Sequence, residues 1–181
     1  MLIRRILCVV LFAALTIATL PSSSLIAQMN GMEHAHAKAE PSTTLTITGP
    51  DGKTLSLSPA DLKAMPHRSI TVANEHTRGT ESYTGVPLTD LLAKTGVPVG
   101  KDLKGKALLF YLLAEGTDHY KVVYSLNEVD SSNHSGVVIV ADSRNGAALT
   151  MDGAFKLVSS EDKRAARWVR NLATITVKSA E

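Results

Sequence analysis

The chain is poor in cysteine: among its 181 residues there is one, Cys8. That residue lies in an N-terminal segment that we expect to be removed, so the processed protein would contain no thiol. A mature chain without a thiol excludes a disulfide, a thiolate nucleophile, a redox thiol and any metal held by cysteine. The cysteine count therefore excludes thiol-based redox chemistry and cysteine-ligated metals for the processed protein.

The chain also lacks a large excess of positive or negative side chains. Lysine and arginine number 19 against 17 aspartate and glutamate residues, and two of the cations, Arg4 and Arg5, belong to the same N-terminal segment. A balanced chain gives no electrostatic footprint for nucleic acid, which requires clustered cations, and we expect no nucleic-acid partner. Apolar residues make up 44% of the chain, enough for a hydrophobic core, so wholesale disorder is excluded.

Long hydrophobic runs are absent except for one, residues 6–20, which follows a short basic start and precedes Pro21 and three serines. This arrangement is typical of a secretory signal peptide. A spanning helix needs about 20 apolar residues, so we expect no permanent membrane anchor. The predicted signal peptide is 1–27, cleaved near Ala27, with residues 22–24 as earlier alternatives. The protein is thus expected to be secreted, and periplasmic if its source is a Gram-negative bacterium.

Residues 28–42 are small and polar, without strand or helix periodicity, and they predict a flexible tether. The tether contains Met29, Met32, His34 and His36, whose thioethers and imidazoles suit copper. Two histidines without a carboxylate or a fixed geometry favour a plain linker instead, and we assign no metal.

Residues 43–178 are predicted to form one β-rich α+β domain with short helices. Alternating residues at 43–48 and 53–57 flank turn residues and predict a hairpin, and Ser58 with Pro59 predicts the start of a short helix. Further strands are expected at 68–73, 106–113, 119–124, 137–141, 155–158 and 172–177. A polar loop is expected at 74–82, a helix at 86–94, a helical turn at 125–130 and a tight turn at 142–146.

Several short blocks follow one another in an order that carries a resemblance. They are residues 83–88 (Tyr-Thr-Gly-Val-Pro-Leu), Leu91-Leu92, Gly96-Val97, Asp118-His119-Tyr120, Asn145-Gly146, and residues 153–158 and 162–170. Together they resemble the sulfite-oxidase-type molybdopterin-binding oxidoreductase domain family over about residues 45–177. The last block is the most specific. The resemblance implies that family's β-rich α+β fold.

The family resemblance also implies a pterin-dithiolene molybdenum centre held by one cysteine, and that cysteine is missing. Counting back from Gly85 places the ligand position at Ala73, within a residue or two. Glu75 and His76 are nearby alternatives as metal ligands, but they would require different coordination chemistry. Where the family has a proline and an arginine, this chain has altered residues: Ala154, Lys156 and Ser160. The chain is similar to a short, secreted, cysteine-free branch of the family.

The resemblance implies that a ligand would lie between the loop after Ala73, the turn at 118–120 and the basic segment from Lys163. The candidate pocket residues are His76, Arg78, Asp118, His119, Lys163, Arg164 and Arg167. If Ser160 caps a helical turn, Lys163, Arg167 and Arg170 share one face of it. The alternative is that these residues are solvated surface charges, with Trp168 anchoring its segment to the core.

From these residues we predict an exported domain without molybdenum or another cofactor, acting as a small-ligand or partner-binding module rather than an enzyme. Its partner would be a small anionic or polar molecule or a periplasmic protein, and its catalytic residues, if any, are unknown. Two alternatives stay open. One is a periplasmic molybdopterin-dependent oxidoreductase with a non-cysteine metal ligand, and the other is an assembly factor for another redox enzyme.

Overall fold

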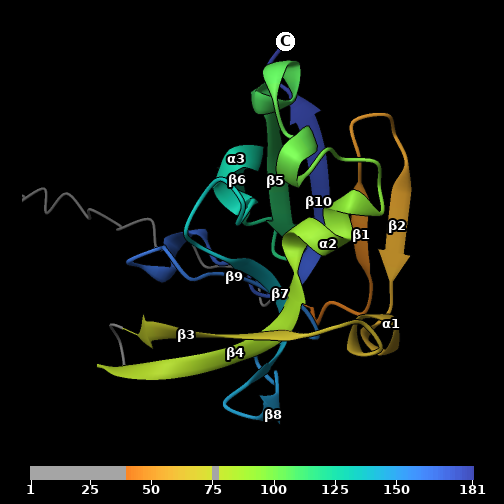
Figure 1. The fold of residues 1–181 in the computed structure, drawn as a ribbon. Coiled ribbons are helices and arrows are strands. Elements are labelled where there is room, and N and C mark those ends of the chain that lie inside the picture. Colours follow the sequence, from red (N-terminus) through yellow and green to blue (C-terminus); the bar gives the residue numbers. More distant parts are fainter. Residues whose placement is uncertain (1–39, 75–77) are drawn as a thin grey trace, which may run out of the picture. The chain divides into compact units, whose positions relative to one another are not determined.

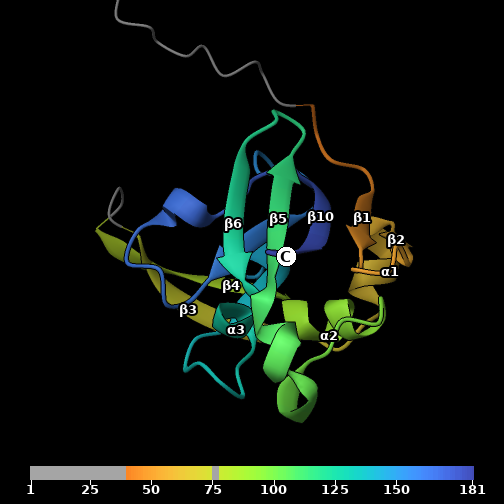
Figure 2. The ribbon, with the colours of Figure 1, turned by 90° about the horizontal axis from the view of Figure 1, so that it is seen from above.

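Two β-sheets form the framework of the computed structural model, which describes residues 40–74 and 78–181 (Figure 1). The predicted signal peptide and almost all of the predicted tether, including its methionines and histidines, lie outside the described residues. The first sheet has the strand order β2-β1-β10-β5-β6, in which β1 and β10 are parallel and the other neighbours antiparallel (Figure 2). Its strands are β1 (Leu45–Thr48), β2 (Thr54–Leu57), β5 (Phe110–Gly116), β6 (Lys121–Ser125) and β10 (Leu172–Ser179).

The second sheet has the order β3-β4-β7-β8, and β9 also pairs with β7. Its strands are β3 (Arg68–Asn74), β4 (Gly79–Pro87), β7 (Val138–Arg144), β8 (Ala147–Ala148) and β9 (Lys156–Ser159). In Figure 1 the β3–β4 hairpin runs across the direction of β5 and β10. The predicted β-rich α+β fold is therefore confirmed.

Short helices connect the strands, and their ends follow the expected capping chemistry. They are α1 (Pro59–Lys63), α2 (Leu88–Ala93), α3 (Leu126–Val129) and the 3-10 turns η1 (Gly100–Asp102), η2 (Gly105–Leu109) and η3 (Ala165–Arg167). Ser58 and Ser125 each cap a helix through a reciprocal box with an acid three residues later. None of the helices in the described part of the chain has the length and hydropathy that crossing a bilayer requires.

Strand β7 explains how the two sheets share a core. Val138 and Val140 belong to the main hydrophobic cluster, between the first sheet and the helices, whereas Ile139 and Ala141 belong to a smaller cluster with Trp168. Alternate side chains of a strand point to opposite faces, so a strand buried on both faces needs a continuous apolar run. The sequence Val-Ile-Val-Ala meets that requirement.

Three sequence expectations differ from the structure. The predicted polar loop at 74–82 contains the first half of β4, because β4 pairs with β3 along its length and buries Glu81 and Tyr83. The predicted helix at 86–94 begins only at Leu88, since residues before it belong to β4. The predicted strand at 106–113 begins only at Phe110, since the residues before it form η2. Of the predicted tether, residue 40 is described and contacts the domain: the Thr117 hydroxyl donates to the Glu40 carbonyl oxygen at 2.6 Å.

Gly85 allows β4 to cross β7 at close range. A Cβ at this position would lie 2.1 Å from the carbonyl oxygen of Val140 and 2.4 Å from the Cα of Ala141. Backbone atoms cannot rotate away, so we expect Gly85→Ala to lower the free energy of unfolding by about 1–3 kcal/mol, measured by urea denaturation. The exposed Ser56→Ala on β2 serves as the control and should change it by less than about 0.5 kcal/mol. Equal values for the two variants would contradict the close approach.

His67 links the start of β3 to β7. Its Nδ1 lies 2.7 Å from the Met65 carbonyl oxygen and its Nε2 lies 2.9 Å from Asp142 Oδ2. Partial burial lowers the pKa of His67, but the hydrogen bonds to Asp142 and Met65 outweigh it, so the pKa lies above the ordinary value of 6.5. A raised folded-state pKa means that this stabilisation is complete below the unfolded-state pKa and is lost as pH rises through the folded-state value.

We therefore expect urea denaturation between pH 5.5 and 8.5 to show a loss of stability of about 1 kcal/mol or less that His67→Gln removes. His134→Gln, which changes a histidine that makes no ion pair among the described residues, is the matched control. An unchanged pH profile in the His67 variant would show that another group causes the dependence.

Candidate functional site

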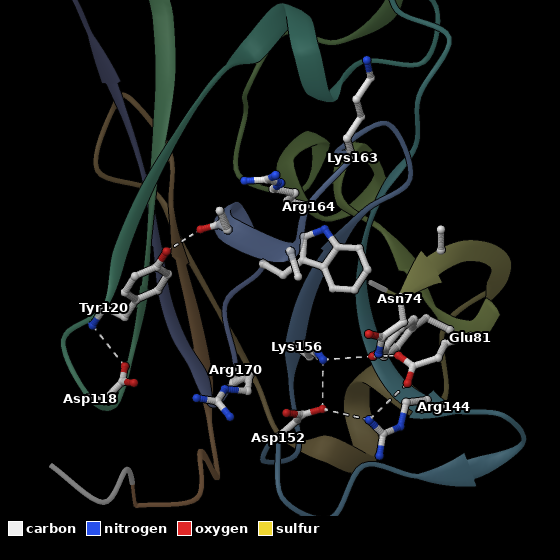
Figure 3. A pocket seen from close by; sticks show the side chains of 15 residues that line it. Asn74, Glu81, Asp118, Tyr120, Arg144, Asp152, Lys156, Lys163, Arg164 and Arg170 are labelled. Carbon is white, nitrogen blue, oxygen red and sulfur yellow. Dashed lines mark hydrogen bonds and ion pairs between the residues drawn. The ribbon is translucent and has the colours of Figure 1, made fainter. Parts of the chain in front are cut away.

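A cavity of about 640 Å³ lies where several distant segments meet (Figure 3). The end of β3, the start of β4, the turn between β5 and β6, the end of β7, β9 and the segment around η3 all contribute to its wall. The residues that line it are Ala73, Asn74, Glu81, Tyr83, Asp118, Tyr120, Arg144, Asp152, Lys156, Lys163, Arg164, Ala165, Ala166, Trp168 and Arg170.

A buried network of charged and polar groups forms one end of the cavity. Lys156 Nζ donates to Asp152 Oδ2 at 2.9 Å and to the Tyr83 hydroxyl at 3.0 Å. The Tyr83 hydroxyl in turn donates to Glu81 Oε2 at 2.8 Å. Arg144 lies 3.9 Å from Glu81 Oε1 and 4.0 Å from Asp152 Oδ2, so two cations face two carboxylates. Glu81, Tyr83, Asp152 and Lys156 are buried, which strengthens their hydrogen bonds and makes the loss of any one of them costly, whereas the Arg144 side chain is 43% exposed.

Two aromatic rings enclose the Lys156 ammonium. Tyr83 and Trp168 pack edge to face with their ring centroids 5.7 Å apart. Lys156 Nζ lies 4.8 Å from the Tyr83 centroid and 5.6 Å from the Trp168 centroid, within the range of a cation–π interaction. The rings thereby exclude water from one side of the charged network.

The cavity as a whole carries more positive than negative charge. Its cationic residues are Arg144, Lys156, Lys163, Arg164 and Arg170, and its acidic residues are Glu81, Asp118 and Asp152. Lys163 and Arg170 are exposed and make no ion pair with any described residue. In Figure 3 Lys163 and Arg164 lie away from the network of Lys156 and Asp152. The unbalanced charge favours an anion in this space.

Tyr120 joins two walls of the cavity. Its hydroxyl donates to the carbonyl oxygen of Ala166, and its backbone N–H donates to Asp118 Oδ1 at 3.0 Å. These bonds connect the turn between β5 and β6 to the basic segment at η3 (Figure 3). Residues at the end of β3, in the turn at 118–120 and in the basic segment from Lys163 therefore line one cavity, while residues 75–77 of the loop after Ala73 lie outside the described residues.

The structure describes six of the seven predicted pocket residues and does not bring all six together. Asp118, Lys163 and Arg164 line the cavity. His119 and Arg78 do not: His119 is exposed and its Nδ1 lies 2.8 Å from Glu115 Oε1, while Arg78 is exposed in the turn before β4. His76 lies outside the described residues, and Arg167 lies in a different place.

Arg167 belongs to a smaller hollow of about 190 Å³. Its guanidinium donates to Glu128 Oε1 at 2.9 Å and to Asp162 Oδ1 at 2.5 Å, and it stacks 4.3 Å from the centroid of the Tyr124 ring. The hydrogen bond to Asp162 is the main cause that raises the pKa of Arg167 above its ordinary range. These contacts hold the η3 segment against α3 and β6, so the role of Arg167 is structural.

The helical turn capped by Ser160, on which a shared face of Lys163, Arg167 and Arg170 depended, does not form, and Arg167 therefore lies apart from the other two. Ser160 Oγ accepts a hydrogen bond from the Val137 N–H at 2.9 Å, and its own N–H donates to the Val137 carbonyl oxygen. Its hydroxyl is therefore not available to cap a helix. Only η3 forms, and Lys163 and Arg170 reach the main cavity while Arg167 does not.

The sequence reasoning missed most of the buried network. Glu81 lies within the predicted loop at 74–82 and Tyr83 beside it, Arg144 lies in the predicted turn at 142–146, and Asp152 lies in a segment for which no element is predicted. The alternation Glu-Ser-Tyr at 81–83 was a usable signal, because alternate residues of a strand share one face. Lys156 had been noted only as a departure from the family pattern.

Ala73 lies in the cavity wall, and the residues around it do not fit a molybdenum centre of the cysteine-ligated kind. The described residues include no cysteine, and no group of three or more histidine, cysteine, aspartate or glutamate residues among them could hold a metal ion. The carboxylates of Glu81 and Asp152 are held by Tyr83, Lys156 and Arg144. A metal ion entering there would have to displace these partners.

Comparison with known proteins agrees with this architecture. A family model described as the oxidoreductase molybdopterin binding domain matches residues 33–181. The crystal structure of the sulfane dehydrogenase SoxCD from Paracoccus pantotrophus is similar, with a TM-score of 0.59 and 24% identity. The match covers 78% of this chain and 40% of that one, so this chain spans less than half of the length of its relative. No curated protein matches the chain significantly.

Proposed function

The chain belongs to the oxidoreductase molybdopterin-binding domain family, and we propose that it is a member that works without molybdenum, as a binding module for a small anionic molecule. The observation that carries the proposal is the cavity with Ala73 in its wall. The position expected to supply a thiolate supplies a methyl group, while a cavity is present beside it. A fold can keep a binding space after its chemistry has changed.

Charge and size support an anionic ligand. A volume of about 640 Å³ is within the range of small-molecule sites. Lys163 and Arg170 bring positive charge that no described acid neutralises, and carboxylate, phosphate or sulfonate groups pair with such side chains through charge-assisted hydrogen bonds. Apolar area beside them, from Trp168 and the alanines, would cover the rest of a small organic anion.

Thermal unfolding with and without anions tests the binding function. We expect phosphate, sulfate and small dicarboxylates to raise the thermal midpoint, and a ligand at 100 times its Kd adds about 2.7 kcal/mol to stability. The double variant Lys163→Gln/Arg170→Gln should lose most of this gain. Lys94→Gln/Lys104→Gln, which removes the same charge from outside the cavity, should keep it. An equal loss in both variants would mean that the anions raise the thermal midpoint by general salt screening and not by binding in the cavity.

Metal analysis and pterin fluorescence of protein purified from its native host test the absence of molybdenum. We expect far less than one molybdenum atom and far less than one pterin molecule per protein chain. Stoichiometric molybdenum would overturn the proposal and favour the alternative, an oxidoreductase whose metal is held without cysteine. The family membership is the observation that keeps this alternative open.

Export is part of the same proposal. The basic start, the apolar run at 6–20 and Ala27 support removal of residues 1–27 and a location outside the cytoplasm. Mass spectrometry of the protein from its host should show a chain that starts near Gln28. An intact Met1 terminus on exported protein would contradict the cleavage.

A further inference from the structure

Lys156 places a primary amine in the wall of the cavity. Binding an anion would require only the positive charge of this group and not its reactivity as an amine. The side chain is only 8% exposed, yet it lines the cavity together with Tyr83 and Trp168. A buried lysine held by a carboxylate and a hydroxyl differs from the exposed Lys163, because its amine is fixed in place beside groups that can exchange protons with it.

The groups around the amine are those that imine formation requires. Attack of an amine on a carbonyl carbon needs a base to take a proton from nitrogen and an acid to protonate the carbonyl oxygen. Asp152 Oδ2, at 2.9 Å, can take the proton. The Tyr83 hydroxyl accepts a hydrogen bond from Nζ at 3.0 Å, so it can give its proton to the carbonyl oxygen while it takes one from the nitrogen.

We propose that Lys156 forms a reversible imine with a small 2-oxo acid bound in the cavity. The carboxylate of the oxo acid pairs with Arg144, whose guanidinium lies 4.0 Å from Asp152 Oδ2 beside the amine, and its carbonyl carbon meets the amine. This inference rests on the proposed function, since it names the class of anion that the cavity takes.

The reaction balances without any further reactant. The Lys156 ammonium gives one proton to Asp152, the free electron pair on nitrogen forms a bond to the carbonyl carbon, and the carbonyl oxygen becomes a hydroxyl. Loss of that hydroxyl as water, with the proton returned through Tyr83 or Asp152, leaves a protonated imine. Ammonium and oxo acid thus become iminium and water, with no change in net charge.

Charge conservation is the reason why this site suits the step. The iminium keeps the positive charge of the ammonium, so Asp152 faces a cation before and after the reaction. Arg144 also approaches Asp152 Oδ2, at 4.0 Å, and shares the carboxylate with Lys156. The carboxylate is therefore never left buried without a cation while the amine reacts.

Reductive trapping in the full-length protein tests the inference. The protein is treated with glyoxylate and sodium cyanoborohydride near neutral pH, and peptide mapping by mass spectrometry follows carboxymethylation of each lysine. We expect Lys156 to be modified at least about tenfold faster than exposed lysines such as Lys94, since a bound and oriented carbonyl reacts at a raised effective concentration. Modification of Lys156 at or below the rate of exposed lysines would overturn the inference.

Two variants and one competitor extend the test. Tyr83→Phe removes the hydroxyl and should slow trapping at Lys156 without slowing it at Lys94. Phosphate, which has no carbonyl group, should compete with glyoxylate and protect Lys156. If anions raise the thermal midpoint but Lys156 is not trapped, only the imine is disproved. If neither occurs, the proposed binding function has also failed.

Discussion

Replacing Trp168 by alanine should lower the free energy of unfolding by about 3–5 kcal/mol, the usual cost of removing a large buried aromatic side chain. Trp168 is 7% exposed and belongs to the small cluster that holds β3, β4, β7 and β9 together. Its edge-to-face contact with Tyr83 and its position over Lys156 connect this cluster to the cavity. Urea denaturation measures the loss.

Trp168→Phe separates packing from hydrogen bonding. The indole Nε1 is buried and has no hydrogen-bond partner among residues 40–74 and 78–181, so phenylalanine keeps much of the packing and removes a donor that these residues leave unsatisfied. We expect the phenylalanine variant to lose less than half of what the alanine variant loses. A loss below about 1 kcal/mol for alanine would mean that Trp168 does not anchor the basic segment.

Much of the fold could be predicted because local chemistry and tertiary structure agree. Ser58 and Ser125 are each followed three residues later by an acid, and both form the expected caps. Asn145 and Gly146 have positive φ values of 52° and 80°, as the turn between β7 and β8 requires. In each case the few residues involved contain the information, and distant contacts only add to it.

The errors arose where a distant contact decides the local structure. Ser160 has the side chain of a helix cap, but Val137 takes both of its hydrogen-bonding groups. Glu81 looks like a loop residue, but it is buried because Tyr83 and Arg144 meet it there. Neither partner can be identified from neighbouring sequence. The family resemblance carries information about the whole fold, and the end of β3, the turn at 118–120 and the basic segment from Lys163 all contribute residues to the cavity.

Lys156→Met is the change expected to disturb the cavity most. Removing the ammonium leaves Asp152 buried with only the more distant Arg144, and breaking a buried ion pair in this way costs about 3–5 kcal/mol. Methionine is close to lysine in length, so the loss reports charge rather than volume. Urea denaturation at neutral pH should show the full effect.

A double-mutant cycle with Asp152→Asn determines whether the loss comes from the pair. The asparagine variant leaves an unpaired ammonium and should also be destabilised, but in the double variant neither charge remains unpaired. We expect the double variant to be more stable than the sum of the single losses predicts, with a coupling of about 1–3 kcal/mol. Strictly additive losses would mean that Lys156 and Asp152 stabilise the domain independently. The charged end of the cavity would then be a set of separate contacts, and its residues could not act together on a bound carbonyl compound.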